Sequence, residues 1–141
     1  MLSAIFSVRD VEISMDYYIN KLGFTSGRTL PGPDGKPDFG SASLGEQAHF
    51  MFNGSSDPFF DDAARGRGVE MHIELPPQYD INALYAEFQQ QGATIVRALQ
   101  DEFWGERRFV ITDPDGYRIS FNQAITEVDD DEETAELISQ S

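Results

Sequence analysis

Apolar and polar residues alternate at two distinct periods along this chain. Alternation at every second residue is typical of strands that bury one face, and apolar residues three or four positions apart are typical of helices that do so. The first pattern predicts strands over residues 4–8, 27–30, 39–44, 48–53, 69–75, 94–99, 107–112 and 117–122. The second predicts helices over residues 11–22 and 81–91, each followed by a glycine, Gly23 or Gly92, that can end it. The run DPDG at residues 113–116 predicts the turn of the last hairpin.

The same order of elements occurs twice. Each half contains a strand, a helix and three further strands, and a shift of 69 residues superposes the two helices together with their closing glycines. Repetition of this kind indicates two similar structural units that pack together. The sequence therefore predicts an α+β fold in which two β-α-β-β-β modules, at about residues 1–53 and 69–123, form a curved mixed sheet around a groove. Residues 54–68 are the expected connector, and the single domain is expected to span residues 1–126.

The first predicted helix has one apolar side. Ile13, Tyr17 and Leu22 share a face at helical spacing, with Met15 and Tyr18 at its flanks. We expect this face to pack on a sheet.

Polar side chains recur on one face of the predicted strands. In the strand over residues 69–75, Met71 and Ile73 point to one side, whereas Glu70, His72 and Glu74 point to the other. The strands over 48–53 and 117–122 repeat this alternation, and the faces opposite their aromatic and aliphatic residues carry His49, Met51, Asn53, Arg118, Ser120 and Asn122. The polar faces of two curved sheets would line a wet, concave binding site. The alternative is that these faces only contact solvent, as one side of an antiparallel sheet often does.

The chain is strongly acidic. Its 141 residues carry a formal net charge of -15, and seven acids lie between residues 127 and 136, within an acidic tail (residues 127–141) that we expect to be dispensable for folding. Such a charge disfavours nucleic acid and anionic membrane surfaces and attracts cationic ligands. Without cysteine, the chain has no disulfide, no thiol nucleophile and no cysteine-bound metal. No long apolar run and no secretion signal occurs, so we expect a cytoplasmic protein without a membrane span.

Two runs of the sequence resemble a known superfamily. VRDVEISMDYYINKLGF at residues 8–24 is similar to the opening of the vicinal-oxygen-chelate superfamily, and FWGERRFVITDPDGYRISF at residues 103–121 is similar to its last hairpin. This superfamily includes glyoxalase I, extradiol dioxygenases, fosfomycin resistance enzymes and bleomycin resistance proteins. The resemblance covers about residues 2–123 and implies the two-module fold. It does not identify one activity, because this fold hosts many chemistries.

The resemblance also implies where a metal would bind. The metalloenzymes of the superfamily place their ligands at positions that correspond here to Ser3, Met51, His72 and Ser120. Only His72 is a good ligand, and a catalytic divalent ion needs about three ligands from histidines and carboxylates. A rearranged site that joins His72 to His49 and to Glu70 or Glu74 would support the alternative function, a metal-dependent enzyme of the glyoxalase or dioxygenase type.

Bleomycin resistance proteins are the members that this chain resembles most. They keep the fold, lack the metal ligands and bind a bulky cationic drug in grooves formed by a homodimer. The resemblance therefore implies a homodimer without metal or other cofactor, which sequesters an aromatic and in some cases cationic molecule and confers antibiotic resistance. This implication argues against an enzyme. The expected ligand-binding residues are His49, Met51, Glu70, His72, Trp104, Arg108 and Ser120.

Trp104 and the following Gly105 match a Trp-Gly pair that bleomycin resistance proteins often carry. The indole ring can stack on a flat or cationic ligand, which contributes about 1 kcal/mol, or it can close the end of the core. The sequence allows both roles. Arg107 and Arg108 would repel a cationic ligand unless they point away from the groove. A third alternative is an interaction or regulatory subunit whose groove is filled by its own side chains.

Overall fold

The computed structural model describes residues 2–125, and the acidic tail lies outside them. The first module contains β1 (Ala4–Ser7), α1 (Val11–Asp16), β2 (Thr25–Pro31), β3 (Pro37–Leu44) and β4 (Ala48–Asn53). The second module contains β5 (Glu70–Glu74), α2 (Ile81–Gln90), β6 (Thr94–Asp101), β7 (Glu106–Thr112) and β8 (Arg118–Ala124). The predicted α+β fold of two β-α-β-β-β modules is confirmed.

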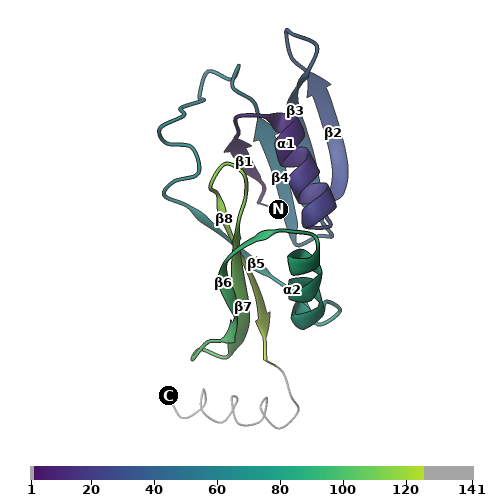
Figure 1. Cartoon of the computed structure of the whole chain (residues 1–141), viewed down its shortest axis with the longest axis vertical. Helices are drawn as coiled ribbons and strands as arrows, with labels where there is room; N and C mark the ends of the chain where they lie inside the picture. The colour runs from purple at the N-terminus through teal and green to yellow at the C-terminus, as the bar shows by residue number, and fades with distance from the viewer. Residues whose placement is uncertain (1, 126–141) are drawn as a thin grey trace.

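Each module forms a four-stranded mixed sheet of the same topology. The strand orders are β1-β4-β3-β2 and β5-β8-β7-β6, and in each sheet the first strand runs parallel to the last one of its module. The two sheets follow one another along the long axis of the molecule, with α1 against the first and α2 against the second (Figure 1). Each sheet therefore has one face covered by its helix and an opposite face, here called the open face. Among residues 2–125, no helix has the length and hydrophobicity needed to span a membrane.

The first helix departs from the prediction at one position of its apolar face, Ile13. Val11 and Met15 contact β3 so closely that a Cβ atom on Gly40 would lie 2.7 Å from the Met15 sulfur. Ile13, which was expected in the core, is 55% exposed. Side chains two residues apart are rotated by about 200° around the helix axis, so they point to nearly opposite sides. A helix that rests on Val11 and Met15 must therefore turn Ile13 towards solvent.

The helix widens directly after α1. Over Tyr17–Lys21 it forms a π-helical turn, in which the Leu22 amide donates to the Tyr17 carbonyl at 3.2 Å. Tyr17, Tyr18 and Leu22 are all buried, as predicted. The Tyr17 hydroxyl donates to the Thr112 carbonyl of β7 at 2.8 Å, so the end of this helix is attached to the second module.

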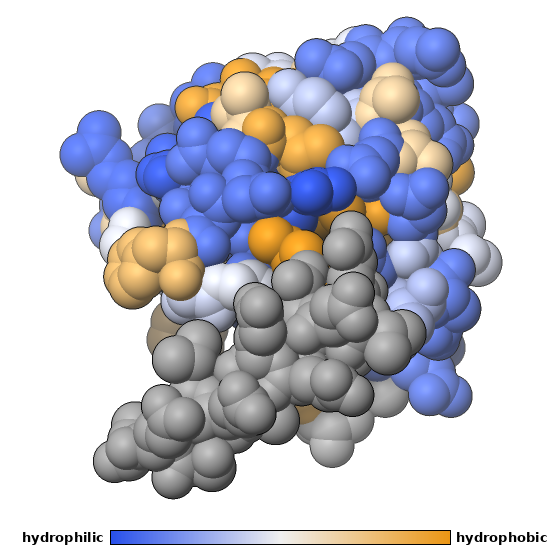
Figure 2. Space-filling view, turned by 90° about the horizontal axis from the view of Figure 1, so that it is seen from below, coloured by the Kyte–Doolittle hydropathy of each residue, from blue (hydrophilic) through white to orange (hydrophobic). Residues whose placement is uncertain are grey.

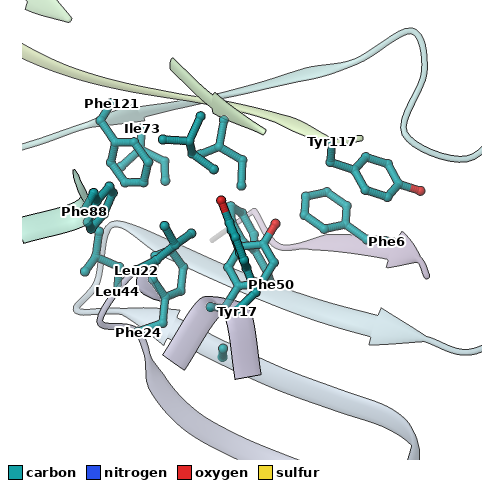
Figure 3. Close-up of a cluster of buried hydrophobic side chains, with 14 of the residues drawn as sticks. Phe6, Tyr17, Leu22, Phe24, Leu44, Phe50, Ile73, Phe88, Tyr117 and Phe121 are labelled. Carbon is teal, nitrogen blue, oxygen red and sulfur yellow. The ribbon is translucent and has the colours of Figure 1, made fainter. Parts of the chain in front are cut away.

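One continuous apolar core joins the two modules (Figure 3). Phe6 of β1 stacks on Tyr117, which directly precedes β8, with 4.4 Å between the ring centroids. The Tyr117 hydroxyl also donates to the Ser7 carbonyl at 2.9 Å. Because the aromatic rings of both modules belong to the same cluster, the modules are held together by packed side chains as well as by the connector.

The turn at residues 113–116 also holds the modules and the connector together. The Asp115 carboxylate is buried and accepts hydrogen bonds from the Arg9 amide at 2.9 Å and from the Ser14 hydroxyl at 3.2 Å. Arg65, in the connector, pairs with the same carboxylate at 2.7 Å. The sequence predicted only a turn here, because turn residues have a local signature and their distant partners do not.

Candidate ligand-binding site

A cavity of about 490 Å³ lies where the two modules meet. It is enclosed by β1, β4, β5 and the segments that lead into them. Its apolar lining consists of Leu2, Ala4, Ile5, Phe6, Ala48, Phe50, Val69, Met71, Ile73 and the ring of Tyr117. Ser3, His49 and His72 contribute polar atoms to the same cavity. An apolar enclosure with a few polar groups is the usual composition of a small-molecule site.

His49 and Met51 both lie next to β1, but only His49 lines the cavity. His49 Nδ1 is 2.9 Å from the Ser3 hydroxyl, so these two side chains bind each other. Met51 pairs in register with Ile5 of β1 and is half-buried. Near the cavity, the open face of the first sheet is therefore more apolar than the alternation alone predicted.

Glu70 is already paired on the open face of the second sheet. Its carboxylate lies 3.3 Å from Nη2 of Arg108 and 3.1 Å from Nε of Arg118. The Arg108 side chain is 16% exposed, so its charge is directed at Glu70 and not at an incoming ligand. Glu70 belongs to the alternative metal set with His72 and His49, but the register of β5 with β8 places it beside Arg118, where it forms these ion pairs instead.

Ser120, one of the expected ligand-binding residues, is fully buried and does not line the cavity. Its strand, β8, lies between β5 and β7, and both Ser120 and Asn122 are fully buried on the open face. The register places the longer side chains of His72, Glu74 and Arg108 beside them. The Asn122 amide donates to the Ser120 hydroxyl at 2.7 Å, and its Nδ2 lies 3.1 Å from His72 Nδ1. Asn122 therefore contacts the imidazole of His72 directly, and Ser120 holds Asn122 in place through its hydrogen bond.

Three potential ligand groups gather on this open face. One nitrogen of His72 and one oxygen each of Glu74 and Glu106 all lie within 4.8 Å of one another. His72 Nε2 is 2.7 Å from Glu74 Oε1. Burial and a hydrogen bond with Glu74 raise the pKa of the Glu106 carboxyl. Within residues 2–125, this set of His72, Glu74 and Glu106 has metal-binding spacing, and the alternative set of His72, His49 and Glu70 does not.

Trp104 lies in the hairpin between β6 and β7, and 47% of it is exposed. Its indole nitrogen donates to Glu106 Oε1 at 2.9 Å, and its ring meets Phe103 edge-on, with 4.9 Å between the centroids. Trp104 therefore does not close the end of the core. Figure 2 shows the lower end of the molecule, from which this hairpin projects, as mainly hydrophilic with small apolar areas.

Comparison with known proteins identifies the family of this chain. The model of the Glyoxalase/Bleomycin resistance protein/Dioxygenase superfamily matches residues 2–121. The chain belongs to this superfamily. An uncharacterized protein of Mycobacterium bovis is 30% identical to it over 146 residues, which cover 99% of this chain and 93% of that protein.

Solved structures of other proteins share the fold. TioX from Micromonospora sp. ML1 superposes with a TM-score of 0.71 at 20% identity, covering 89% of this chain and 99% of TioX. TnmS3, an antibiotic binding protein from Streptomyces sp. CB03234, superposes with a TM-score of 0.61 at 22% identity, covering 88% of this chain and 96% of TnmS3. Both superpositions cover the two modules, so the similarity includes the arrangement of the modules as well as the sequence motifs.

The metal positions of the superfamily do not fit this chain. Ser3 and Ser120 offer hydroxyl groups, Ser120 is fully buried, and Met51 offers a thioether. A hard or borderline divalent ion requires about three imidazole or carboxylate ligands, and among these four positions only His72 supplies one. No chemistry is therefore assigned to a metal at these positions.

Proposed function

We propose that this protein is a binding protein of the superfamily that sequesters an aromatic, positively charged small molecule. The cavity between the modules is the observation on which this proposal rests. Its volume of about 490 Å³ falls within the range of about 300–1,000 Å³ that is usual for small-molecule sites. TnmS3, which shares the fold, is an antibiotic binding protein. Antibiotics are therefore the first class of ligand to test.

The electrostatics of the second sheet support a cationic ligand. The two arginines that were expected to oppose it are both paired with acids. Arg108 pairs with Glu70 and is largely buried, and Arg107 pairs with Asp101 at 2.6 Å. Trp104 is half-exposed beside Glu106, and an indole ring attracts both flat aromatic groups and cations. The net charge of -15 raises the local concentration of cations around the whole chain.

A second copy of the chain is proposed to complete the site. β1 and β5, which border the cavity, are both edge strands of their sheets. Leu2, Ile5 and Val69 are exposed there, and Ile5 retains 59% of its surface. Unpaired strand edges with apolar residues favour association. We therefore propose a homodimer in which the partner covers this margin.

Calorimetric titration with bleomycin and with a planar cationic antibiotic tests the proposal. In Ile5→Arg, a charge replaces part of the apolar wall, so we expect the affinity to fall by about tenfold or more. Ile13→Arg is the matched control, because Ile13 is exposed to a similar degree on α1 and does not line the cavity. Absence of binding to the unmodified protein, or equal weakening in both variants, would refute the proposal for these ligands.

A further inference from the structure

We infer that His72, Glu74 and Glu106 form a binding site for a divalent transition-metal ion, with Zn²⁺ and Co²⁺ as representative ions. Only His72 corresponds to a metal position of the superfamily. The two carboxylates come from other positions on the open face of the second sheet. The inference does not depend on the proposed small-molecule ligand, because the ion alone is sufficient to test it.

The donor set matches the requirements of such an ion. An imidazole nitrogen and two carboxylate oxygens are three ligands of the types that Zn²⁺ and Co²⁺ accept. Their atoms lie within 4.8 Å of one another, and bonds of about 2.1 Å place ligand atoms about 3–4 Å apart. His72 and Glu74 are exposed, so small rotations can bring them to bonding distance. The exposed side leaves room for water to complete the coordination.

The geometry of the sheet holds these ligands in place. His72 and Glu74 are two residues apart on β5, so they point to the same face. Glu106 begins β7, on the far side of β8. Regular strands support all three, and sites on such rigid elements are more precise than sites on loops.

A buried amide beneath His72 supplies an independent observation. Asn122 is fully buried, its Nδ2 lies 3.1 Å from His72 Nδ1, and its Oδ1 is buried without a hydrogen-bond partner. The two ends of an amide are interchangeable in position. When Oδ1 faces the imidazole, it accepts the Nδ1 proton and can also accept from the Ser120 hydroxyl, while the 3.4 Å bond of Nδ2 to the Ile73 carbonyl is lost. The lone pair of Nε2 then faces the two carboxylates, where a cation can lie between them. Metal-binding histidines characteristically have such a partner on their other nitrogen.

The charges on this face also leave the site free for a cation. Among the described residues, Arg108 and Arg118 both pair with Glu70, while the ion-pair partner of Glu74 is His72. Glu106 receives a hydrogen bond from the Trp104 indole, and its carboxylate lies within 4.8 Å of that of Glu74. Two carboxyl groups at this distance repel each other when both are charged, and a cation between them removes this repulsion.

The test is a titration of chelator-stripped protein without a histidine tag. We expect calorimetry to show one equivalent of Co²⁺ or Zn²⁺. Co²⁺ quenches nearby indole emission, and Trp104 is the single tryptophan of the chain. Saturable quenching with the same dissociation constant is therefore expected. His72→Gln and Glu106→Gln should each weaken binding by about tenfold or more, since even the loss of a residue that supports a ligand costs about 10–100-fold.

Glu87→Gln is the matched control. It makes the same change of charge as Glu106→Gln, but Glu87 is exposed on α2, on the opposite face of the same sheet. Its affinity should stay within about twofold of the unmodified protein. The inference is overturned by absence of saturable binding up to about 1 mM, by binding without quenching, or by equal affinities of Glu106→Gln and Glu87→Gln. Failure of antibiotic binding would leave this result unchanged, so the two proposals are tested separately.

Discussion

The Tyr18 hydroxyl donates a hydrogen bond to the Asp113 carboxylate at 2.8 Å, and both side chains are buried where the two modules meet. The same carboxylate accepts bonds from the amides of Asp115 and Tyr117, each at 2.9 Å. Burial is the largest influence on this group, and it raises the pKa of Asp113 to about 6 in spite of these bonds. At neutral pH the buried Asp113 carboxylate between the modules is therefore charged, and this buried charge lowers the stability of the fold.

This charge makes stability depend on pH in a defined direction. The usual pKa of the Asp113 carboxyl is 3.8. Between about pH 4 and pH 6 the folded chain keeps a proton that the unfolded chain has lost, so the free energy of unfolding falls as the pH rises through this window. Asp113→Asn removes this titration and can keep the hydrogen bonds. Between pH 4 and pH 7 the variant should gain about 2 kcal/mol relative to the unmodified protein. Urea unfolding across this range measures it, and parallel pH profiles would contradict the expectation.

Loss of the neighbouring carboxylate should instead be destabilising. Asp115→Ala removes the acceptor for the Arg9 amide and the Ser14 hydroxyl and leaves Arg65 without its buried partner. Breaking a buried pair on one side costs about 3 kcal/mol or more. Asp62→Ala is the control, because it removes the exposed partner of the same Arg65 and should change stability little. Thermal and urea unfolding compare the two, and equal losses would show that the buried position of Asp115 is unimportant.

Trp104 should affect binding more than folding. Because the residue is half-exposed, Trp104→Ala should lower stability by about 1 kcal/mol or less. A ligand that stacks on the indole should lose about 1–3 kcal/mol of binding free energy. Phe59→Ala removes another exposed aromatic ring, in the connector, and should alter neither property. Calorimetric titration and melting curves of both variants measure these effects. A stability loss of several kcal/mol in Trp104→Ala would indicate a core role instead.

The chain should form a homodimer in solution. Apolar residues beside the edge strands β1 and β5 are exposed in the part of the chain that the structure describes. Sedimentation velocity at micromolar concentration should give twice the mass of one chain. Ile5→Arg introduces a charge into this margin and should shift the equilibrium towards monomer, whereas Ile13→Arg should not. A purely monomeric unmodified protein would exclude the dimer.

Much of the fold followed from local patterns. Alternation of apolar residues identified the strands, glycines after each helix marked its end, and the repeated order of elements indicated two modules. Within the site, local pattern also placed His49, Met51 and His72 on the faces opposite the core residues. These features depend on neighbours within a few positions in the chain, because the periods of strand and helix are local properties.

Other features depended on contacts between distant residues. Ile13 has the spacing of a core residue, but the contact of Val11 and Met15 with Gly40 decides which side of the helix is buried. Glu106 shows no local relation to His72 and Glu74, since only the register of β5, β8 and β7 brings them together. Ser120 and Asn122 are buried because the strands on either side of β8 place longer side chains beside them. The sequence thus determined the elements and the residues on each face, while the register and packing of the folded sheets decided which of those residues meet.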